Sequence, residues 1–357
     1  MAEVPPAAPR LAFIDALKAV AAQLIVLHHL AFYGPMSDQA YPLLPSLISW
    51  LSQDARIAVQ AFLVIGGFLA AQSLASAGTL LSSRPLALLW RRYQKLVRPY
   101  LAALLIAIAC AAIARTLMEH DSLPGAPTLP QLATHALLLQ SILGYEGLSA
   151  GIWYIAIDFQ LFALLLGMLW LARRIGRGRA AGALGVAALA LASLYHFNRD
   201  PAWDVWGVYF FASYGLGVLV YWATDQKPAS GWLLLIAVPV IIALLLDYRS
   251  RIAVALLLAL ALGVARSTGF LEHWPRSRLI ATLGKISYSV FLVHFPIFLV
   301  IGGLFARFAT QAPWVNLVGM IIAWLASVVA GSVFHRFVET RAWFRRPLPA
   351  PGFNRKP

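Results

Sequence analysis

Charged residues are scarce in this chain of 357 residues. Aspartate, glutamate, lysine and arginine together make up 12% of it, against 61% hydrophobic residues. So few polar side chains cannot cover the surface of a water-soluble globule of this length. Because long apolar segments recur along the whole sequence, we predict an all-α, polytopic transmembrane helical bundle.

Cysteine is almost missing as well, since Cys110 is the only one. A single cysteine excludes an internal disulfide and a metal site built on cysteine pairs, and its apolar neighbours predict a packing role. The sequence also lacks a Walker-type phosphate loop, an HExxH motif and an H-x4-D motif. Only His28 and His29 are close together among the eight histidines, so we predict no metal site.

Four ionisable residues interrupt the first apolar segment, Phe13–Leu30: Asp15, Lys18, His28 and His29. On a helix, Lys18 and His29 are eleven residues apart and share one face at a distance of about 16 Å, while His28 points elsewhere. Ionisable groups inside a span usually face the bundle interior and mark a pathway or a reaction centre. The alternative is that these residues lie at the two interfaces, where Asp15 and Lys18 pair or snorkel.

A basic run, RRYQKLVRPY, precedes the third span. It carries Arg91, Arg92, Lys95 and Arg98, of which the last three fall on neighbouring helical turns, followed by Tyr100. Such a cluster is suited to binding phosphates. A cytoplasmic loop that only sets the topology explains part of the cluster, and the sequence alone leaves both interpretations open.

Three later segments also place polar groups against apolar runs. WYIAIDFQLF puts Asp158 five residues after Trp153, where a carboxylate needs a partner. GKISYSVFLVHFPI contains Tyr288 and His294, either of which could simply be a hydrogen-bonded packing residue. In HRFVETRAW, Glu339 lies between two arginines, and a surface ion pair is the simplest account.

The number of spans depends on the segment 132–143, which is too short to cross unaided. If it does not cross, ten spans result, and 22 of the 28 lysines and arginines lie on the side of the N-terminus. If it does cross, only 11 lie on that side. The positive-inside rule therefore favours ten spans, both termini in the cytoplasm and a re-entrant or interfacial segment before Gly151. The predicted spans are 11–32, 57–75, a third ending near 118, 153–172, 180–196, 205–223, 231–246, 252–265, 283–305 and 314–337.

The same charge pattern argues against nucleic-acid binding, although the net charge is +14, because the basic residues flank the spans. We expect no cleavable signal peptide. Residues 1–343 are predicted to form one membrane domain, and residues 344–357 a basic, proline-rich cytoplasmic tail.

Six of these stretches together resemble membrane-bound acyltransferase family 3, over nearly the whole chain. IDALKAVAAQLIVLHH is similar to the opening LDGLRGxAAxxVVxxH of that family, with His29 at its essential histidine and Lys18 where it usually has arginine. AFLVIGGFLA resembles FFxxSGFL, and RRYQKLVRPY resembles RRxxRLxPxY. WYIAIDFQLF resembles WxLxxExQFY, with Asp158 in place of glutamate. GKISYSVFLVHFPI and FHRFVET resemble GxxSYxxYLxHxP and YRFxExP.

The resemblance implies a bacterial inner-membrane O-acyltransferase. It would move an acyl group, usually acetyl, from cytoplasmic acetyl-CoA to a hydroxyl of a cell-surface polysaccharide. No tightly bound cofactor and no metal is expected. The partners would be acyl-CoA, a carbohydrate or lipid-linked sugar, the lipid bilayer and proteins of polysaccharide biosynthesis. His29 would act either as general base or as a transient acyl carrier, and the direct route needs one fewer intermediate.

The roles implied for individual residues fall into three groups. The catalytic residues would be His29, Lys18, Asp15 and Asp158; the donor-binding residues Arg92, Lys95, Arg98 and Tyr100; and the substrate-binding residues Trp153, Tyr154, Tyr288 and His294. The alternative function is a transporter or flippase that uses Asp158, Lys18 and His29 as a substrate or proton pathway, although the sequence has no clear internal repeat.

Overall fold

A computed structural model describes residues 10–82, 84–176, 178–225 and 229–341 of the chain, and these residues contain helices and no strand. Nine helical segments among them are long and apolar enough to cross a membrane. They are built on α1 (Ala12–Phe32), α4 (Val59–Ala75), α5 (Pro85–Leu117), α7 (Trp153–Arg174), α8 (Gly178–Tyr195), α10 (Ala229–Leu246), α11 (Ser250–Ser267), α13 (Arg278–Phe308) and α14 (Pro313–Phe334). A tenth apolar helix, α9 (Gly207–Ala223), has 17 residues. The predicted helical bundle is confirmed.

Shorter helices connect the long ones: α2 (Pro35–Ala40), α3 (Pro45–Gln53), the 3-10 turn η2 (Ala55–Ala58), α6 (Leu129–Ala136) and α12 (Phe270–His273). The π-helical turn η5 (His335–Glu339) follows α14. Helix α6 has eight residues, or about 12 Å, so the segment before Gly151 does not cross. A capping box between Thr128 and Gln131 starts this helix, and Leu138 follows its end with a positive φ of 59°. The predicted tail, 344–357, lies outside the described residues.

One predicted boundary was wrong. The basic run was expected to lead into the third span, whereas α5 begins at Pro85 and the run lies within its first half. Proline at the start of a helix needs no N–H partner, which fixes this beginning. Pro99 follows inside the same helix. One continuous helix therefore holds both the basic residues Arg91, Arg92 and Lys95 and the long apolar half that follows them.

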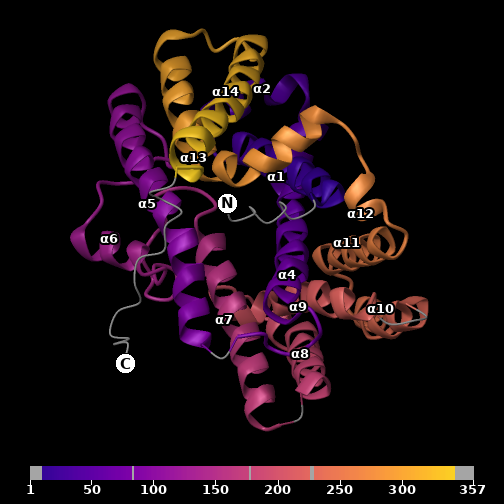
Figure 1. The fold of residues 1–357 in the computed structure, drawn as a ribbon. Helices are drawn as coiled ribbons and strands as arrows, with labels where there is room; N and C mark the ends of the chain where they lie inside the picture. The colour runs from indigo at the N-terminus through magenta and orange to yellow at the C-terminus, as the bar shows by residue number, and fades with distance from the viewer. Residues whose placement is uncertain (1–9, 83, 177, 226–228, 342–357) are drawn as a thin grey trace, which may run out of the picture.

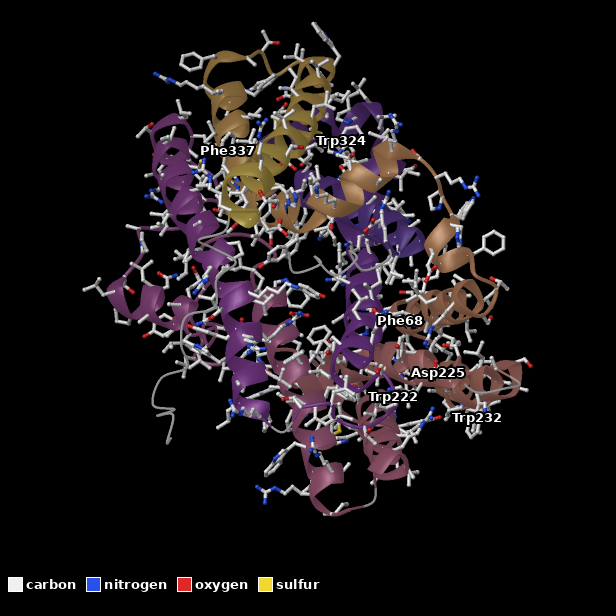
Figure 2. The ribbon with its side chains drawn as sticks, in the orientation of Figure 1. Phe68, Trp222, Asp225, Trp232, Trp324 and Phe337 are labelled. Atoms are coloured by element: carbon white, nitrogen blue, oxygen red, sulfur yellow. The ribbon has the colours of Figure 1, made fainter. Side chains whose placement is uncertain are left out.

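Helix α9 packs against α4 with almost no side chain between the two backbones. A Cβ atom on Gly67 would lie 1.9 Å from the carbonyl oxygen of Tyr214, and one on Gly217 would lie 2.0 Å from that of Val64. The two glycines therefore permit the contact from both sides. Figure 2 shows Trp222 beside α4, where its indole N–H donates to the carbonyl of Ala75 at 2.8 Å.

Helix α13 holds the other half of the bundle together, because it packs against α1, α5 and α14. Gly284 lies against the backbone of Asp15, where a Cβ would be 2.2 Å from the carbonyl oxygen, and Gly331 of α14 lies against Val290. Figure 1 shows α13 and α14 at one end of the molecule and α8 at the other. The bundle thus has two buried apolar clusters, one around α4, α7 and α9 and one around α13 and α14.

Candidate active site

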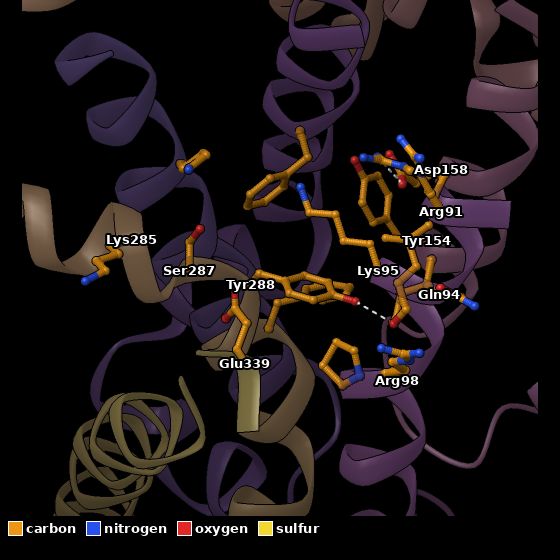
Figure 3. A pocket seen from close by; sticks show the side chains of 17 residues that line it. Arg91, Gln94, Lys95, Arg98, Tyr154, Asp158, Lys285, Ser287, Tyr288 and Glu339 are labelled. Atoms are coloured by element: carbon orange, nitrogen blue, oxygen red, sulfur yellow. Dashed lines mark hydrogen bonds and ion pairs between the residues drawn. The ribbon is translucent and has the colours of Figure 1, made fainter. Parts of the chain in front are cut away.

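A cavity of about 760 Å³ opens where α1, α4, α5, α7, α13 and η5 meet (Figure 3). Its wall combines basic, aromatic and acidic side chains that come from distant parts of the sequence. The lining residues are Lys18, Phe62, Arg91, Arg92, Gln94, Lys95, Leu96, Arg98, Pro99, Tyr154, Ile155, Asp158, Lys285, Ser287, Tyr288, Phe291 and Glu339.

The wall of the cavity is strongly positive. Six basic side chains face two carboxylates, which leaves an excess of four positive charges. Arg91, Lys95 and Lys285 are exposed and make no ion pair with any residue that the structure describes. Figure 3 shows the Lys95 side chain extending into the space between α5 and α13. These three cations are therefore available to an anionic ligand.

Two other basic residues of the wall are paired. Arg92 Nη2 donates to Asp158 Oδ2 at 2.5 Å, and the Arg92 guanidinium lies over the Phe162 ring at 5.2 Å. Lys18 Nζ lies 3.3 Å from Asp15 Oδ1. The other carboxylate oxygen of Asp15, Oδ2, accepts a hydrogen bond from Arg10 Nε at 2.8 Å. Asp158 therefore has the partner that its burial requires, and most of the charge of Arg92 is already neutralised.

The apolar end of the cavity is aromatic. Phe62, Tyr154 and Phe291 follow one another with ring centroids 6.1 Å and 5.9 Å apart. Beyond them lies Gly151, at a φ of +80°, where a Cβ would be 3.1 Å from the Phe291 ring and 3.4 Å from Cε1 of His29. His29 is not a lining residue, so Phe291 and Gly151 stand between the basic cavity and the imidazole.

His29 is joined to His294 of α13. Their atoms Nδ1 and Nε2 are 2.6 Å apart, and the two rings are inclined by only 12° with centroids 4.9 Å apart. This spacing fits a hydrogen bond that lies in the common plane of both rings. His28 turns away and bonds the Leu51 carbonyl at 2.9 Å, as the helical spacing predicts.

A buried histidine outside the spans shapes the loop beside His29. His135 of α6 donates from Nδ1 to the Gln131 carbonyl at 2.7 Å, and its Nε2 accepts from the Leu148 N–H at 3.3 Å. Burial lowers the pKa of His135 below its usual value, in keeping with a neutral ring that needs a bare nitrogen. The loop from Leu148 to Gly151 is thereby fastened to α6.

The remaining predicted residues fall in different places. Tyr154 and Tyr288 line the main cavity, and the Tyr288 hydroxyl donates to the Leu96 carbonyl at 3.2 Å. Trp153 lines a second hollow of about 250 Å³, together with Asp204 and Phe210. Tyr100 is fully buried and does not line the cavity.

The interpretation of Glu339 as part of a surface ion pair was wrong. Glu339 lines the cavity, and its Oε2 accepts from Ser289 at 2.6 Å and contacts His335 Nδ1 at 2.9 Å. The five-residue π-helical turn η5 turns this carboxylate toward α13, and such turns are frequent at functional sites. The neighbouring arginines, at 336 and 341, lie beside the Phe337 ring.

Three features of the site had no role assigned to them from the sequence. Lys285 and Phe291 reach the cavity from α13. Lys285 is a charged residue at the start of the GKISYSVFLVHFPI segment, whereas no local pattern separates Phe291 from a packing residue. The loop beside His29 reads GLSAG, and the hydroxyl of its Ser149 is buried without a partner among the described residues. A G-x-S-x-G pattern indicates a nucleophilic serine when it lies between a strand and a helix. The described residues contain no strand, so the pattern alone does not assign that role to Ser149.

Comparison with known proteins agrees with the arrangement of motifs. The sequence profile of a family described as an acyltransferase domain, acyltransferase 3, matches residues 11–335. No curated protein and no solved structure matches the chain. The match covers all of the long helices and the whole cavity except Glu339. The chain is therefore a multi-pass membrane protein that belongs to the acyltransferase 3 family.

Proposed function

We propose that this acyltransferase takes its acyl group from acetyl-CoA in the cytoplasm and transfers it to a hydroxyl of a cell-surface carbohydrate. The observation that carries the proposal is the positive cavity whose aromatic end, at Phe291, is separated from His29 only by Gly151. A transporter or flippase does not require unpaired cations beside a histidine in this way.

The charge of the cavity suits coenzyme A. A diphosphate and a ribose 3′-phosphate carry about four negative charges together, and the wall has an excess of four positive charges. Arg91, Lys95 and Lys285 are the cations that no described acidic residue neutralises. They would hold the phosphates beside the first halves of α5 and α13.

The length of coenzyme A also suits the site. Lys18, which lines the cavity, and His29 are eleven residues apart on one helix, so about 16 Å separates their levels. The pantetheine arm is a chain of about a dozen bonds, on the order of 15 Å when extended. Phosphates held near Lys18 would therefore place the thioester close to Phe291 and His29.

The proposed chemistry is a direct transfer. Neutral His29 takes the proton of the acceptor hydroxyl, and the oxygen attacks the thioester carbonyl carbon. The carbon–sulfur bond breaks, an ester forms, and the thiolate leaves with the proton that His29 returns to it. Lys18, Asp15 and Asp158 act by shaping the cavity and its charge.

The acceptor would approach from the opposite side, through the hollow that Trp153, Asp204 and Phe210 line. Trp153 and Phe210 rings lie 5.5 Å apart, and aromatic walls with a carboxylate suit the apolar faces and hydroxyls of a sugar. This arrangement requires both termini in the cytoplasm of a bacterium with the protein in its inner membrane. Proteins of polysaccharide biosynthesis would supply the acceptor.

The test uses the purified full chain in sealed proteoliposomes, with labelled acetyl-CoA on one side and a bacterial polysaccharide on the other. We expect labelled ester on the polysaccharide and release of equal amounts of free coenzyme A. Polysaccharide that crosses the membrane without acquiring label would instead support a flippase. Omitting the acceptor distinguishes direct transfer from a covalent route, because label on the chain, at His29 or at Ser149, would contradict the direct route.

A further inference from the structure

The hydrogen bonds around His294 determine which nitrogen of His29 carries the proton. His294 Nδ1 lies 2.8 Å from the carbonyl oxygen of Phe291 and 3.2 Å from that of Val290. A carbonyl oxygen can only accept, so His294 Nδ1 must be the nitrogen that bears hydrogen. These carbonyls belong to the same helix, one turn earlier, and therefore hold the ring in a fixed orientation.

The second nitrogen of His294 is then an acceptor. A neutral imidazole has one N–H, and no carboxylate is hydrogen-bonded to either ring among the described residues, so nothing stabilises a second proton here. His294 Nε2 lies 2.6 Å from His29 Nδ1. His29 must therefore donate from Nδ1, and its Nε2 keeps the lone pair.

We infer that His294 is a positioning residue, which holds His29 as the Nδ1–H tautomer and leaves its Nε2 as the basic nitrogen. The inference deepens the proposed function and rests on it for the role of His29. A free histidine in water prefers the opposite tautomer, with hydrogen on Nε2, in which the nitrogen facing away from His294 could not accept a proton. The bond to His294 reverses that preference.

The same bond serves both states of the base. When His29 Nε2 takes the proton of the acceptor hydroxyl, Nδ1 still donates to His294, and the bond becomes charge-assisted and stronger. The hydrogen bond to His29 thus gives His294 a role in orienting the base. From the sequence, His294 was either a packing residue or a substrate-binding residue.

The first test needs no variant. Chain labelled with ¹⁵N and ¹³C in histidine, in lipid nanodiscs, reports the tautomer of each neutral ring through its ring nitrogen shifts. The His29 signals are identified by their loss in His29→Ala. We expect His29 and His294 both as Nδ1–H tautomers, and an Nε2–H signal for His29 would overturn the inference, whether or not transfer activity is found.

The second test compares two substitutions of similar size. The side-chain oxygen of His294→Gln can reach the place of Nε2 and accept from His29, whereas His294→Leu offers no acceptor. We expect kcat to fall by about 10- to 1,000-fold in His294→Leu and to recover at least about tenfold in His294→Gln, with the KM for acetyl-CoA unchanged in both.

The kinetic result separates positioning from packing. A purely structural role predicts equal losses in both variants, or a change in KM, and either result overturns the inference. Nanodisc samples of each variant are first compared by thermal unfolding. If neither variant folds, the tautomer measured in the unaltered chain decides. If the unaltered chain has no transferase activity, the proposed function fails, while the tautomer measurement still stands on its own.

Discussion

Lys95→Gln tests whether the cavity cations bind the phosphates of acetyl-CoA. Lys95 extends into the cavity without an ion pair among the described residues, so removing its charge leaves no buried carboxylate unpaired. A hydrogen bond to a charged phosphate is worth about 1.5 kcal/mol at the lower end of its range, which suits a hydrated cavity. We therefore expect kcat/KM for acetyl-CoA to fall roughly tenfold, through KM, because 1.4 kcal/mol corresponds to a factor of ten.

Acetyl-pantetheine provides the comparison. It carries the same thioester and the same arm but no phosphate, so Lys95→Gln should leave its kcat/KM unchanged. Arg307→Gln serves as the matched control, since Arg307 is exposed at the far end of α13, 22 residues or about 33 Å beyond Lys285. Steady-state release of coenzyme A or pantetheine measures all four combinations. An equal loss with both donors, or no loss with acetyl-CoA, would refute the assignment of phosphate binding to Lys95.

Three further predictions concern the structure itself. Gly67→Ala should lower the thermal unfolding midpoint markedly, because its Cβ would overlap the Tyr214 carbonyl. Gly167→Ala is the control and should not lower the midpoint, because the space around Gly167 is open. Equal midpoints in the two variants would contradict the α4–α9 contact. Arg92→Ala should destabilise the fold by about 3 kcal/mol or more by leaving buried Asp158 unpaired, and Arg92→Ala with Asp158→Asn should regain part of this in chemical denaturation. The pKa of His135 is lower in the folded chain than in the unfolded one, so the unfolded state binds its proton more readily, and stability contributed by neutral His135 is lost as the pH falls below about 6.5. Proteolysis of the loop after α6 should accelerate as the pH falls below about 6.5 in the unaltered chain and depend less on pH in His135→Gln.

Much of the fold follows from composition, because a bilayer permits few alternatives to apolar helices. The charge split alone identified the segment 132–143 as one that does not cross, and α6 ends after eight residues. The beginning of α5 was missed because the apolar span starts only after the basic run, and hydropathy does not show that the helix extends through the run to Pro85. Its helix is stabilised instead by tertiary contacts such as the Arg92–Asp158 pair, which joins residues 66 positions apart.

The site was predictable where its residues lie on one helix. The spacing of Lys18, His28 and His29 gave their relative directions, since helical geometry is local. The partners of these residues were not predictable, because His294 reaches His29 across 265 positions of sequence and Lys285 enters the cavity from the same distant helix. Glu339 was misjudged for a related reason, because its contact with Ser289 joins residues 50 positions apart.

The central claim is that His29 is the base to which the donor cavity leads, and comparing His29→Ala with His28→Ala tests it most directly. Both residues are buried on α1, and only His29 contacts His294. With labelled acetyl-CoA and a polysaccharide acceptor, the account predicts that His29→Ala loses about 10²- to 10⁴-fold in turnover while it stays folded, and that His28→Ala keeps most of its activity. Full turnover in His29→Ala, or equal losses in the two variants, would contradict it.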